Sequence, residues 1–438
     1  MHLYGSMKVN HFGHLEIGGC DTVKLAEKYG TPLIVYDVAL IRHRARSFRR
    51  AFEQLNVNGH VAYAGKAFSS VAILQLMNEE GLSLDVVSGG ELFTAMRAQF
   101  PPEKIHFHGN NKSDEEMEMA LDYGIGYFVV DNFHELKRLQ QLCEKRKIRQ
   151  PILLRMTPGV EAHTHDYILT GQEDSKFGFD LQNGQAEKAL EVALSLPNIK
   201  VDGIHCHIGS QIFETDGFIM AIEKLFAYIK RWKERFHFVP AIVNVGGGFG
   251  IRYTEEDEPL EPYSYVKAIA REVIRQAERI SIAVPDIWIE PGRSLVGDAG
   301  TTIYTIGSRK EIPGVRTYIS VDGGMSDNIR PALYQAKYDA VVANKLLKKT
   351  EETVSVAGKA CESGDMLIWD IPLPQTTAGD LLAVFCTGAY GYSMASNYNR
   401  LPRPAVVFVE NGKSHLAIKR ERYEDVMHLD VPLYETVK

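Results

Sequence analysis

The sequence predicts an α/β protein in which a (β/α)8 TIM-type barrel is followed by an all-β C-terminal domain, sandwich-like or barrel-like. Short β-rich runs alternate with helical patterns after residue 60, and this alternation is typical of parallel strands. After residue 300 the pattern changes to strands joined by Gly, Pro and polar turns. A chain of 438 residues also exceeds one ordinary core, so two domains are expected.

Eight β-rich runs make up the predicted barrel: "HVAYAG", "LSLDVVS", "KIHFHGN", "GYFVVD", "PILLRMTP", "VDGIHCHIG", "AIVNVGGG" and "DIWIEPG". Segments between them, such as "SSVAILQLMNEEG", "GGELFTAMRAQF" and "NFHELKRLQQLCEKRK", carry apolar residues at the three- and four-residue spacing of amphipathic helices. Eight such repeats match a closed barrel. A doubly wound open sheet is the weaker alternative, because no GxGxxG motif opens the first unit.

The predicted β domain consists of the runs "TTIYTIGSRK", "RTYISVDGG", "YDAVVANK", "TVSVAGKAC", "DLLAVFCTG" and "PAVVFVENGKSHLAIKR". Within the last run, "ENGK" is typical of a tight hairpin turn. The N-terminal runs "HLEIG" and "PLIVYD" precede the barrel and are expected to join the β domain. The expected boundaries are therefore 1–36 for this N-terminal segment, 37–296 for the barrel and 297–438 for the β domain.

Composition excludes several classes of protein. The net charge is -7 and no block of basic residues occurs, which argues against nucleic-acid binding. No apolar run approaches the roughly 20 residues of a membrane helix, and the start lacks a signal-peptide pattern, so a cytoplasmic location is expected. The cysteines are odd in number, widely spaced and without a CxxC pair, which predicts reduced thiols: Cys20, Cys143, Cys206, Cys361 and Cys386.

Barrel enzymes carry their active sites at the C-terminal ends of the strands. The residues expected there are Lys66, Ser88, Asn110, Asp131, Arg155, His207, Gly246 to Gly248 and Glu290. The turns "GGGFG" (246–250) and "EPGR" (290–293) end the last two strands, where backbone N–H groups of small residues can hold a phosphate. A lone Lys66 at a strand end would be an ordinary solvated lysine. As one of this convergent set it becomes a candidate catalytic group.

This set suits pyridoxal 5′-phosphate. Lys66 would form the Schiff base, the two glycine turns would hold the phosphate, and Glu290 would keep the pyridine nitrogen protonated. His207 would stack its flat ring on the pyridine, and the Ser210 hydroxyl could add a contact to the phosphate. His205 is interpreted as a packed core histidine.

A metal site is the rival interpretation. His205 and His207 form an HxH pair on one strand face, as in metal-dependent barrel hydrolases, and "HTHD" at 163–166 could supply further ligands. This alternative is disfavoured, because the pair falls on the sixth strand and a metal hydrolase has no need for a glycine cradle. No metal is therefore expected.

Six motifs occur in the order seen in diaminopimelate decarboxylases: "YAGKA", "HIGSQ", "GGGFG", "EPGR", "CESGD" and "GAYGYSMAS". The chain resembles this family, part of the fold-type III pyridoxal-phosphate decarboxylases, over nearly its whole length. The resemblance implies that Lys66 is the Schiff-base lysine, His207 the stacking residue, Glu290 the pyridinium partner and Cys361 the proton donor. The further residues expected at the cofactor are Ser210, Gly247, Gly248, Gly292, Arg293 and Tyr390, and of these the resemblance places Gly248, Gly292 and Tyr390 at the phosphate.

The runs "DNIRPALY" and "CESGD" resemble the branch that acts on diaminopimelate. The residues implied at the substrate are Arg293, Arg330, Tyr334, Glu362 and Tyr390. A distal carboxylate needs a guanidinium and a distal ammonium needs an acid, which agrees with this assignment. "EDSKFGFD" (173–180) also matches the branch, and its Lys176 is a weaker candidate for the Schiff base because it lies in a polar loop.

The expected function is decarboxylation of meso-2,6-diaminopimelate to L-lysine and CO2, the last step of lysine biosynthesis. The resemblance also implies a homodimer with active sites at the interface. The alternatives are a decarboxylase of another basic amino acid or of the carboxynorspermidine type, a non-enzymatic pyridoxal-phosphate-binding homologue, and the metal-dependent hydrolase. A non-enzymatic homologue should lack Lys66, Glu290 or Cys361, and all three are present.

Overall fold

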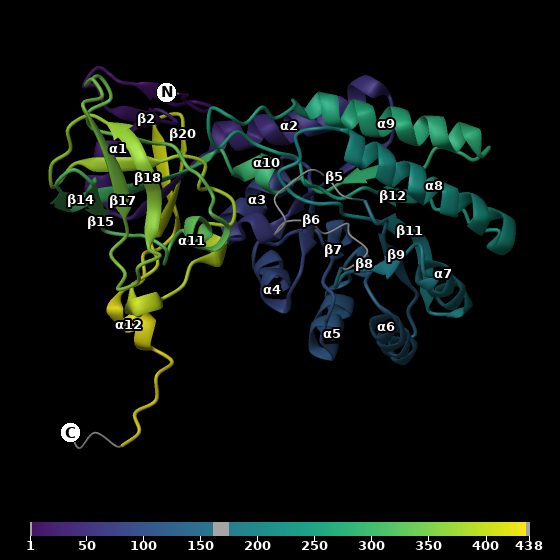
Figure 1. Ribbon diagram of the computed structural model, residues 1–438. Coiled ribbons are helices and arrows are strands. Elements are labelled where there is room, and N and C mark those ends of the chain that lie inside the picture. The colour runs from purple at the N-terminus through teal and green to yellow at the C-terminus, as the bar shows by residue number, and fades with distance from the viewer. Residues whose placement is uncertain (1, 161–174, 435–438) are drawn as a thin grey trace. The chain divides into compact units, whose positions relative to one another are not determined.

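A computed structural model describes residues 2–160 and 175–434 (Figure 1). The chain divides into two compact units. One unit, called the barrel unit below, comprises residues 42–251 and 258–295. The other, called the β unit, comprises residues 1–41, 252–257 and 296–438.

The barrel unit is a closed parallel β-barrel, which confirms the predicted fold class. Its strands are β5 (Gly59–Ala64), β6 (Ser83–Val86), β7 (Ile105–Phe107), β8 (Tyr127–Val130), β9 (Gln150–Thr157), β11 (Ile199–His205), β12 (Ile242–Asn244) and β13 (Asp286–Ile289). Each strand pairs in parallel with the next, β13 pairs with β5, and the pairing of β8 with β9 completes the ring. A short strand, β10 (Phe179–Asp180), adds to β9.

Helices follow the strands and lie outside them (Figure 1). They are α2 (Val38–Leu55), α3 (Val71–Glu79), α4 (Gly89–Arg97), α5 (Asp114–Tyr123), α6 (Phe133–Arg146), α7 (Gln185–Ser195), α8 (Asp216–Phe236), α9 (Pro262–Arg279) and α10 (Arg293–Val296). Helices α3 to α6 each begin after a polar N-cap, respectively Ser70, Ser88, Ser113 and Asn132. These side chains accept backbone N–H bonds in the first turn, so each helix start is set by its own sequence.

Part of the barrel interior is filled by a core of aromatic and aliphatic side chains. Val129, Leu153, Ile242 and Trp288 form one buried cluster. The Trp288 ring stacks on His106 with ring centroids 4.7 Å apart. A packed interior of this kind closes the barrel, so that chemistry is confined to its ends.

The β unit is built around a sheet in the order β18-β17-β15-β14-β4-β20-β21. Its strands are β4 (Leu33–Asp37), β14 (Gly300–Ile312), β15 (Arg316–Val321), β16 (Ala340–Val342), β17 (Glu352–Ala357), β18 (Met366–Leu373), β19 (Leu381–Val384), β20 (Ala405–Glu410) and β21 (Lys413–Ile418). Strand β4, from the N-terminal segment, pairs with β14 and β20. Strand β16 pairs with β19, which pairs in turn with β14.

Smaller elements complete the β unit. They are β1 (Lys8–Val9), β2 (Leu15–Ile17), β3 (Cys20–Asp21), α1 (Thr22–Tyr29), α11 (Arg330–Tyr334) and α12 (Tyr423–Met427). Asn411 and Gly412 both have positive φ between β20 and β21. This backbone suits a two-residue hairpin turn, as "ENGK" predicts.

Two features of the β unit are absent from the sequence-based prediction. Strand β18 is an edge strand that contains Asp370, with φ 51°, and Pro372. Both residue types are uncommon in strands, so the sequence alone does not predict one here. Residues 252–257 belong to the β unit although they lie between β12 and α9 in the chain. The Arg252 carbonyl accepts hydrogen bonds from Tyr4 Oη and Cys386 Sγ, each at 3.2 Å.

In the described part of the chain, no helix combines the length and the apolar character that crossing a membrane requires.

Candidate active site

Lys66 lies at the C-terminal end of β5, in the short 3-10 turn η1 (Gly65–Ala67). Its side chain is exposed, whereas Gly65 and Ala67 on either side are buried. A Cβ on Gly65 would approach the Asp85 carbonyl oxygen to 2.8 Å, so only glycine allows the turn to pack against β6. The buried strand therefore delivers one amine to the barrel mouth.

The ends of β11, β12, β13 and β5 lie side by side. Ile212 N donates to Gly248 O at 2.9 Å, Glu290 N donates to Gly246 O at 2.9 Å, and Ala64 N donates to Pro291 O at 3.2 Å. The motifs "HIGSQ", "GGGFG", "EPGR" and "YAGKA" thus form a continuous arc of the barrel rim.

The glycines of this arc permit close backbone packing. A Cβ on Gly247 would lie 2.1 Å from Glu290 O, and one on Gly248, where φ is +100°, would lie 2.4 Å from Gly209 O. A Cβ on Gly292 would lie 3.0 Å from Ala64 Cβ. Arg293 Nη2 donates to Ser210 Oγ at 3.0 Å across the same rim. The glycines are therefore required by the packing of neighbouring strand ends, and the same packing lines the rim with backbone.

Glu290 is a buried carboxylate held by neutral and basic donors. Asn244 Nδ2 donates to Oε1 at 2.6 Å, and His205 Nε2 lies 3.0 Å from Oε2. Burial alone would raise the pKa of Glu290, but His205 and His108 beside it hold this pKa well below its usual range. The carboxylate is therefore ionised at neutral pH.

Several of these partners were not predicted as functional residues. His205 is buried, as expected for a core histidine, and it also contacts Glu290. Asn244 and His108 were not singled out as candidates. The motif "HFH" (106–108) carries the same two-residue period as "HCH" (205–207) and could have pointed to His108.

His207 lies half-buried at the mouth, and its Nδ1 accepts a hydrogen bond from Gly247 N at 3.2 Å. Burial, Lys66 and Arg155 together hold the pKa of His207 well below its usual value. The ring is therefore neutral and flat, and it lies near enough to Lys66 and Arg155 to respond to their charges.

The metal alternative named His205 and His207 as ligands. Among the described residues, the donor atoms that lie close enough to one another for one ion are those of His108, His205 and Glu290, and His207 is not a member of this group. The members of this trio already face one another, with Asn244 donating to the carboxylate. His163, His165 and Asp166 lie outside the described residues.

In the β unit, Arg330 is enclosed by tyrosines. Its Nε donates to Tyr338 Oη at 3.0 Å, and its guanidinium lies 5.9 Å from the Tyr253 ring, 5.5 Å from Tyr334 and 5.7 Å from Tyr390. Although burial acts to lower the pKa of Arg330, the tyrosines raise it, so the guanidinium remains charged. Tyr253 and Tyr338 were not predicted: Tyr253 comes from a distant segment, and Tyr338 lies four residues beyond the end of the "DNIRPALY" motif. Such a cage holds a cation at a fixed place.

Cys361 and Glu362 lie in the loop that joins β17 to β18. Both side chains are exposed, and Cys361 N donates to Asn399 Oδ1 at 2.7 Å. Asp365 accepts hydrogen bonds from Met325 N at 2.6 Å and from Ala360 N at 2.8 Å. This carboxylate therefore fastens the "CESGD" loop to the segment that leads into α11 and Arg330.

Two further candidates have distinct surroundings. Tyr390 adopts φ +60°, which is strained for a residue with a side chain. Such strain is typical of functional positions. Lys176 is exposed, with its Nζ 4.9 Å from the ring of its neighbour Phe177.

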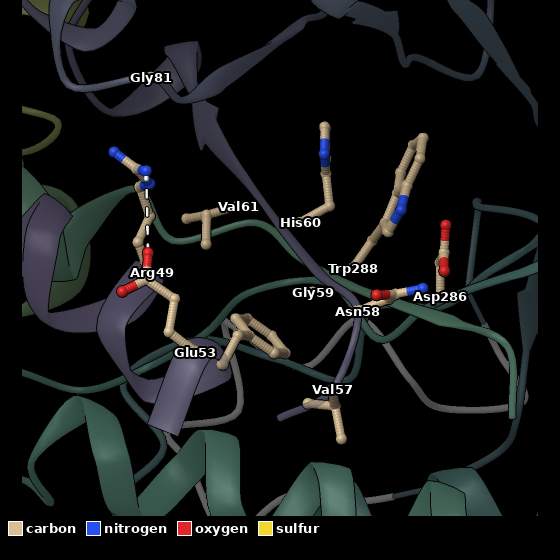
Figure 2. A pocket seen from close by; sticks show the side chains of 11 residues that line it. Arg49, Glu53, Val57, Asn58, Gly59, His60, Val61, Gly81, Asp286 and Trp288 are labelled. Atoms are coloured by element: carbon tan, nitrogen blue, oxygen red, sulfur yellow. Dashed lines mark ion pairs between the residues drawn. The ribbon is translucent and has the colours of Figure 1, made fainter. Parts of the chain in front are cut away.

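A cavity of about 470 Å³ opens at the opposite end of the barrel. Figure 2 shows the side chains that line it. It is lined by the first residues of β5 and β13, including His60, Asp286 and Trp288, and by Arg49 and Glu53 of α2. The His60 ring stacks on Trp288 at 4.4 Å between centroids. Because Lys66 follows the other end of β5, this cavity is not part of the candidate active site.

The residues of the barrel unit fit pyridoxal 5′-phosphate. The cofactor needs an amine for its aldehyde, an anionic partner for its ring nitrogen and a cradle for its phosphate. Lys66 supplies the amine, Glu290 is a carboxylate kept ionised by its neighbours, and the glycine arc carries Arg293 and Ser210. The donor set thus matches the cofactor group by group.

Comparisons with known proteins agree with this fit. Residues 38–297 match the family model described as pyridoxal-dependent decarboxylase, pyridoxal binding domain. A diaminopimelate decarboxylase from Bacillus methanolicus is 67% identical over 421 residues, covering 96% of this chain and 98% of the relative. The diaminopimelate decarboxylase of Bacillus subtilis is 64% identical over 438 residues and 100% of both chains.

Solved structures give the same picture. Diaminopimelate decarboxylase from M. jannaschii, in co-complex with L-lysine, superposes with a TM-score of 0.91 at 35% identity and 98% coverage of both chains. The enzyme from Helicobacter pylori, complexed with L-lysine, has a TM-score of 0.85 at 32% identity, covering 94% of this chain and 99% of that one.

Proposed function

Because the chain belongs to the diaminopimelate decarboxylases, within the pyridoxal-dependent decarboxylases, we propose that it converts meso-2,6-diaminopimelate to L-lysine and CO2 with the site residues assigned below. The chain and the cited Bacillus relatives match over almost their entire lengths. The observation that carries the residue assignment is the barrel rim, where an exposed lysine follows β5, and the neighbouring strand β13 is followed by a carboxylate that its neighbours keep ionised.

When bound, pyridoxal 5′-phosphate supplies a ring that accepts the electrons left by the departing carboxylate. Lys66 would hold the cofactor through its amine. Glu290 would favour a proton on the ring nitrogen, because a nearby anion favours the protonated form. His207, neutral and flat, would pack against the ring.

The phosphate is assigned to the glycine arc. The groups proposed to hold it are Ser210, Gly247, Gly248, Gly292, Arg293 and Tyr390. Backbone N–H groups and a guanidinium are the donors that phosphate oxygens favour. Glu290, which directly follows β13, belongs to the same rim.

The substrate's distal end is assigned to the β unit. Arg330, charged and caged by tyrosines, would bind the distal carboxylate, and Glu362 would bind the distal ammonium. Arg293, Tyr334 and Tyr390 would complete this pocket. A guanidinium paired with a carboxylate orients both partners, so this contact would place the other end of the substrate at the reacting position.

Cys361 is assigned to return a proton to the substrate's Cα after CO2 leaves. Its thiol is exposed at the tip of a loop that Asp365 fastens. A proton donor must come within hydrogen-bond reach of the atom it serves. We assign that contact to the barrel of a partner subunit, in a homodimer whose active sites lie at the interface.

The cytoplasm is the proposed location. Cys20, Cys143, Cys206, Cys361 and Cys386 are all free thiols, and Cys361 is exposed. An exposed thiol with a catalytic task remains reduced in a reducing compartment and is at risk of oxidation outside it.

The experiment that tests the assignment is borohydride reduction of the purified holoenzyme. We expect the yellow colour to bleach and peptide mapping to place a stable pyridoxyl group on Lys66. Lys66→Arg should remain unlabelled, whereas Lys176→Arg, the matched control, should be labelled like the wild type. Labelling of Lys176 instead, or a protein with bound zinc and no chromophore, would contradict the assignment.

Substitution of Arg330 tests the substrate pocket. Arg330→Ala should raise the KM for diaminopimelate roughly ten- to hundred-fold with a smaller change in kcat, because a charged hydrogen bond to the distal carboxylate is lost. Arg316→Ala is the control, since Arg316 pairs with Asp370 on the exposed surface of the same unit. An unchanged KM in steady-state kinetics would remove Arg330 from the pocket.

A further inference from the structure

A buried group of charges lies behind Glu290 in the barrel interior. His108 Nε2 lies 3.3 Å from Glu290 Oε1 and 3.5 Å from Asp85 Oδ1. The three side chains are each more than nine-tenths buried. One imidazole nitrogen therefore faces two buried carboxylates, one at the end of β13 and one on β6.

Two buried carboxylates require a cation near them, because an unpaired buried charge is strongly destabilising. Asn244 is a neutral donor. Burial lowers the pKa of His205, against the opposing effect of Glu290, so His205 carries the charge less readily than a histidine whose pKa is raised. Arg155 lies 3.8 Å from a different carboxylate, Asp131. The group placed directly between the two carboxylates is His108.

The groups around His108 favour the protonated, positively charged form of its imidazole. Burial alone would lower its pKa, but Glu290 and Asp85 raise the pKa of His108 to about 9. Other ionisable groups also face it: His205 of β11, whose ring lies edge-on at 5.0 Å, and Glu91 of α4. His106 lies on β7, which His108 directly follows, and approaches the shared Asp85 oxygen at 3.3 Å through its Nδ1.

We propose that His108, held by Asp85, is a positioning residue that keeps the Glu290 carboxylate ionised and oriented toward the ring nitrogen of the cofactor. The role of Glu290 in this inference rests on the proposed function. His108 itself contacts neither substrate nor cofactor and acts only through Glu290. Asp85 acts one step further away, by favouring the charged form of His108.

The first test is the pH dependence of turnover. His108→Gln should lower kcat about a hundred-fold, as expected when a catalytic group loses its orientation. In this variant kcat should also no longer show the part of its decline at alkaline pH that deprotonation of His108 causes. Asp85→Asn should move that decline to lower pH, because removing a nearby anion lowers the pKa of the imidazole. His106→Gln is the matched control: a buried histidine two residues before His108 that faces Asp85 and not Glu290. It should keep the decline at the wild-type pH.

The second test reads the histidine directly in the holoenzyme, independently of activity. With 15N-labelled histidine, NMR should show one imidazole that titrates near pH 9, is absent in His108→Gln and titrates at lower pH in Asp85→Asn. A histidine whose pKa is raised on folding stabilises the protein fully below its unfolded pKa, and this contribution is lost as the pH rises through the folded pKa. The difference in melting temperature between wild type and His108→Gln should therefore shrink between pH 6.5 and 9, since about 6.5 is the ordinary pKa of histidine.

The outcomes separate this inference from the proposed function. If Lys66 is labelled by borohydride but no histidine titrates above pH 8, the inference about His108 is wrong and the proposed function stands. If a histidine titrates as expected and Lys66 is not labelled, the inference about His108 stands and the proposed function fails. Should His108→Gln not fold, the shift in Asp85→Asn decides the matter, and an unshifted titration there overturns the inference. All samples are dialysed against a chelator, so that metal binding by the trio cannot imitate the titration.

Discussion

Replacing Glu290 with glutamine is expected to leave the cofactor bound while lowering the rate of decarboxylation roughly a hundred- to thousand-fold, the loss typical of removing one preorganised electrostatic group. The side chain keeps its size and can still accept from Asn244 Nδ2, which now donates at 2.6 Å. A neutral amide, however, cannot favour the protonated ring nitrogen. The substitution therefore preserves the shape of the side chain and removes its negative charge.

The measurement combines two readouts on the same sample. Release of CO2 from meso-diaminopimelate gives kcat, and the absorbance of the bound cofactor gives its content. Glu272→Gln is the control, because Glu272 is also a buried carboxylate but lies on α9 and pairs with Arg275. A Glu290→Gln enzyme that turns over at nearly the wild-type rate would show that the ring nitrogen needs no anionic partner.

Mixing two inactive variants is expected to restore activity if the proposed active site is shared between subunits. Lys66 belongs to the barrel unit, and Cys361 belongs to the β unit nearly 300 residues later in the chain. In a two-fold dimer that exchanges this loop, the exchange occurs twice. Lys66→Ala and Cys361→Ala should each be nearly inactive. A hybrid dimer places both lesions in one site and leaves the other intact.

The expected yield follows from random pairing. When an equal mixture is dissociated and re-formed, about half the dimers are hybrids, and each has one working site of two, so roughly a quarter of wild-type activity should return. Mass spectrometry of the native dimers confirms the exchange, and the mixture before dissociation serves as the control. A re-paired mixture no more active than its components would place lysine and cysteine in the same chain's site, or remove the cysteine from the reaction.

The repeat pattern and the glycine turns were sufficient to predict the barrel and its rim. Parallel strands carry their C-terminal ends to one edge, so the residues following "HVAYA", "VDGIHCH", "AIVNV" and "DIWI" had to meet there. The structure confirms this convergence through the backbone hydrogen bonds of Ala64, Ile212 and Glu290. The edge strand β18 was missed because Asp370 and Pro372 disfavour a strand locally, and the strand is formed only through its pairing with β17.

The sequence by itself determined which residues end each strand and which of them carry an amine, a carboxylate or a glycine turn. Only the tertiary structure decided that His108, Asp85 and Asn244 lie beside Glu290, or that Tyr253 and Tyr338 enclose Arg330. Alternation along a strand reveals which side chains point into a barrel, but their height relative to the neighbouring strands depends on the stagger with which the barrel closes. That stagger arises from the packing of all eight strands together, and no single segment of the sequence specifies it.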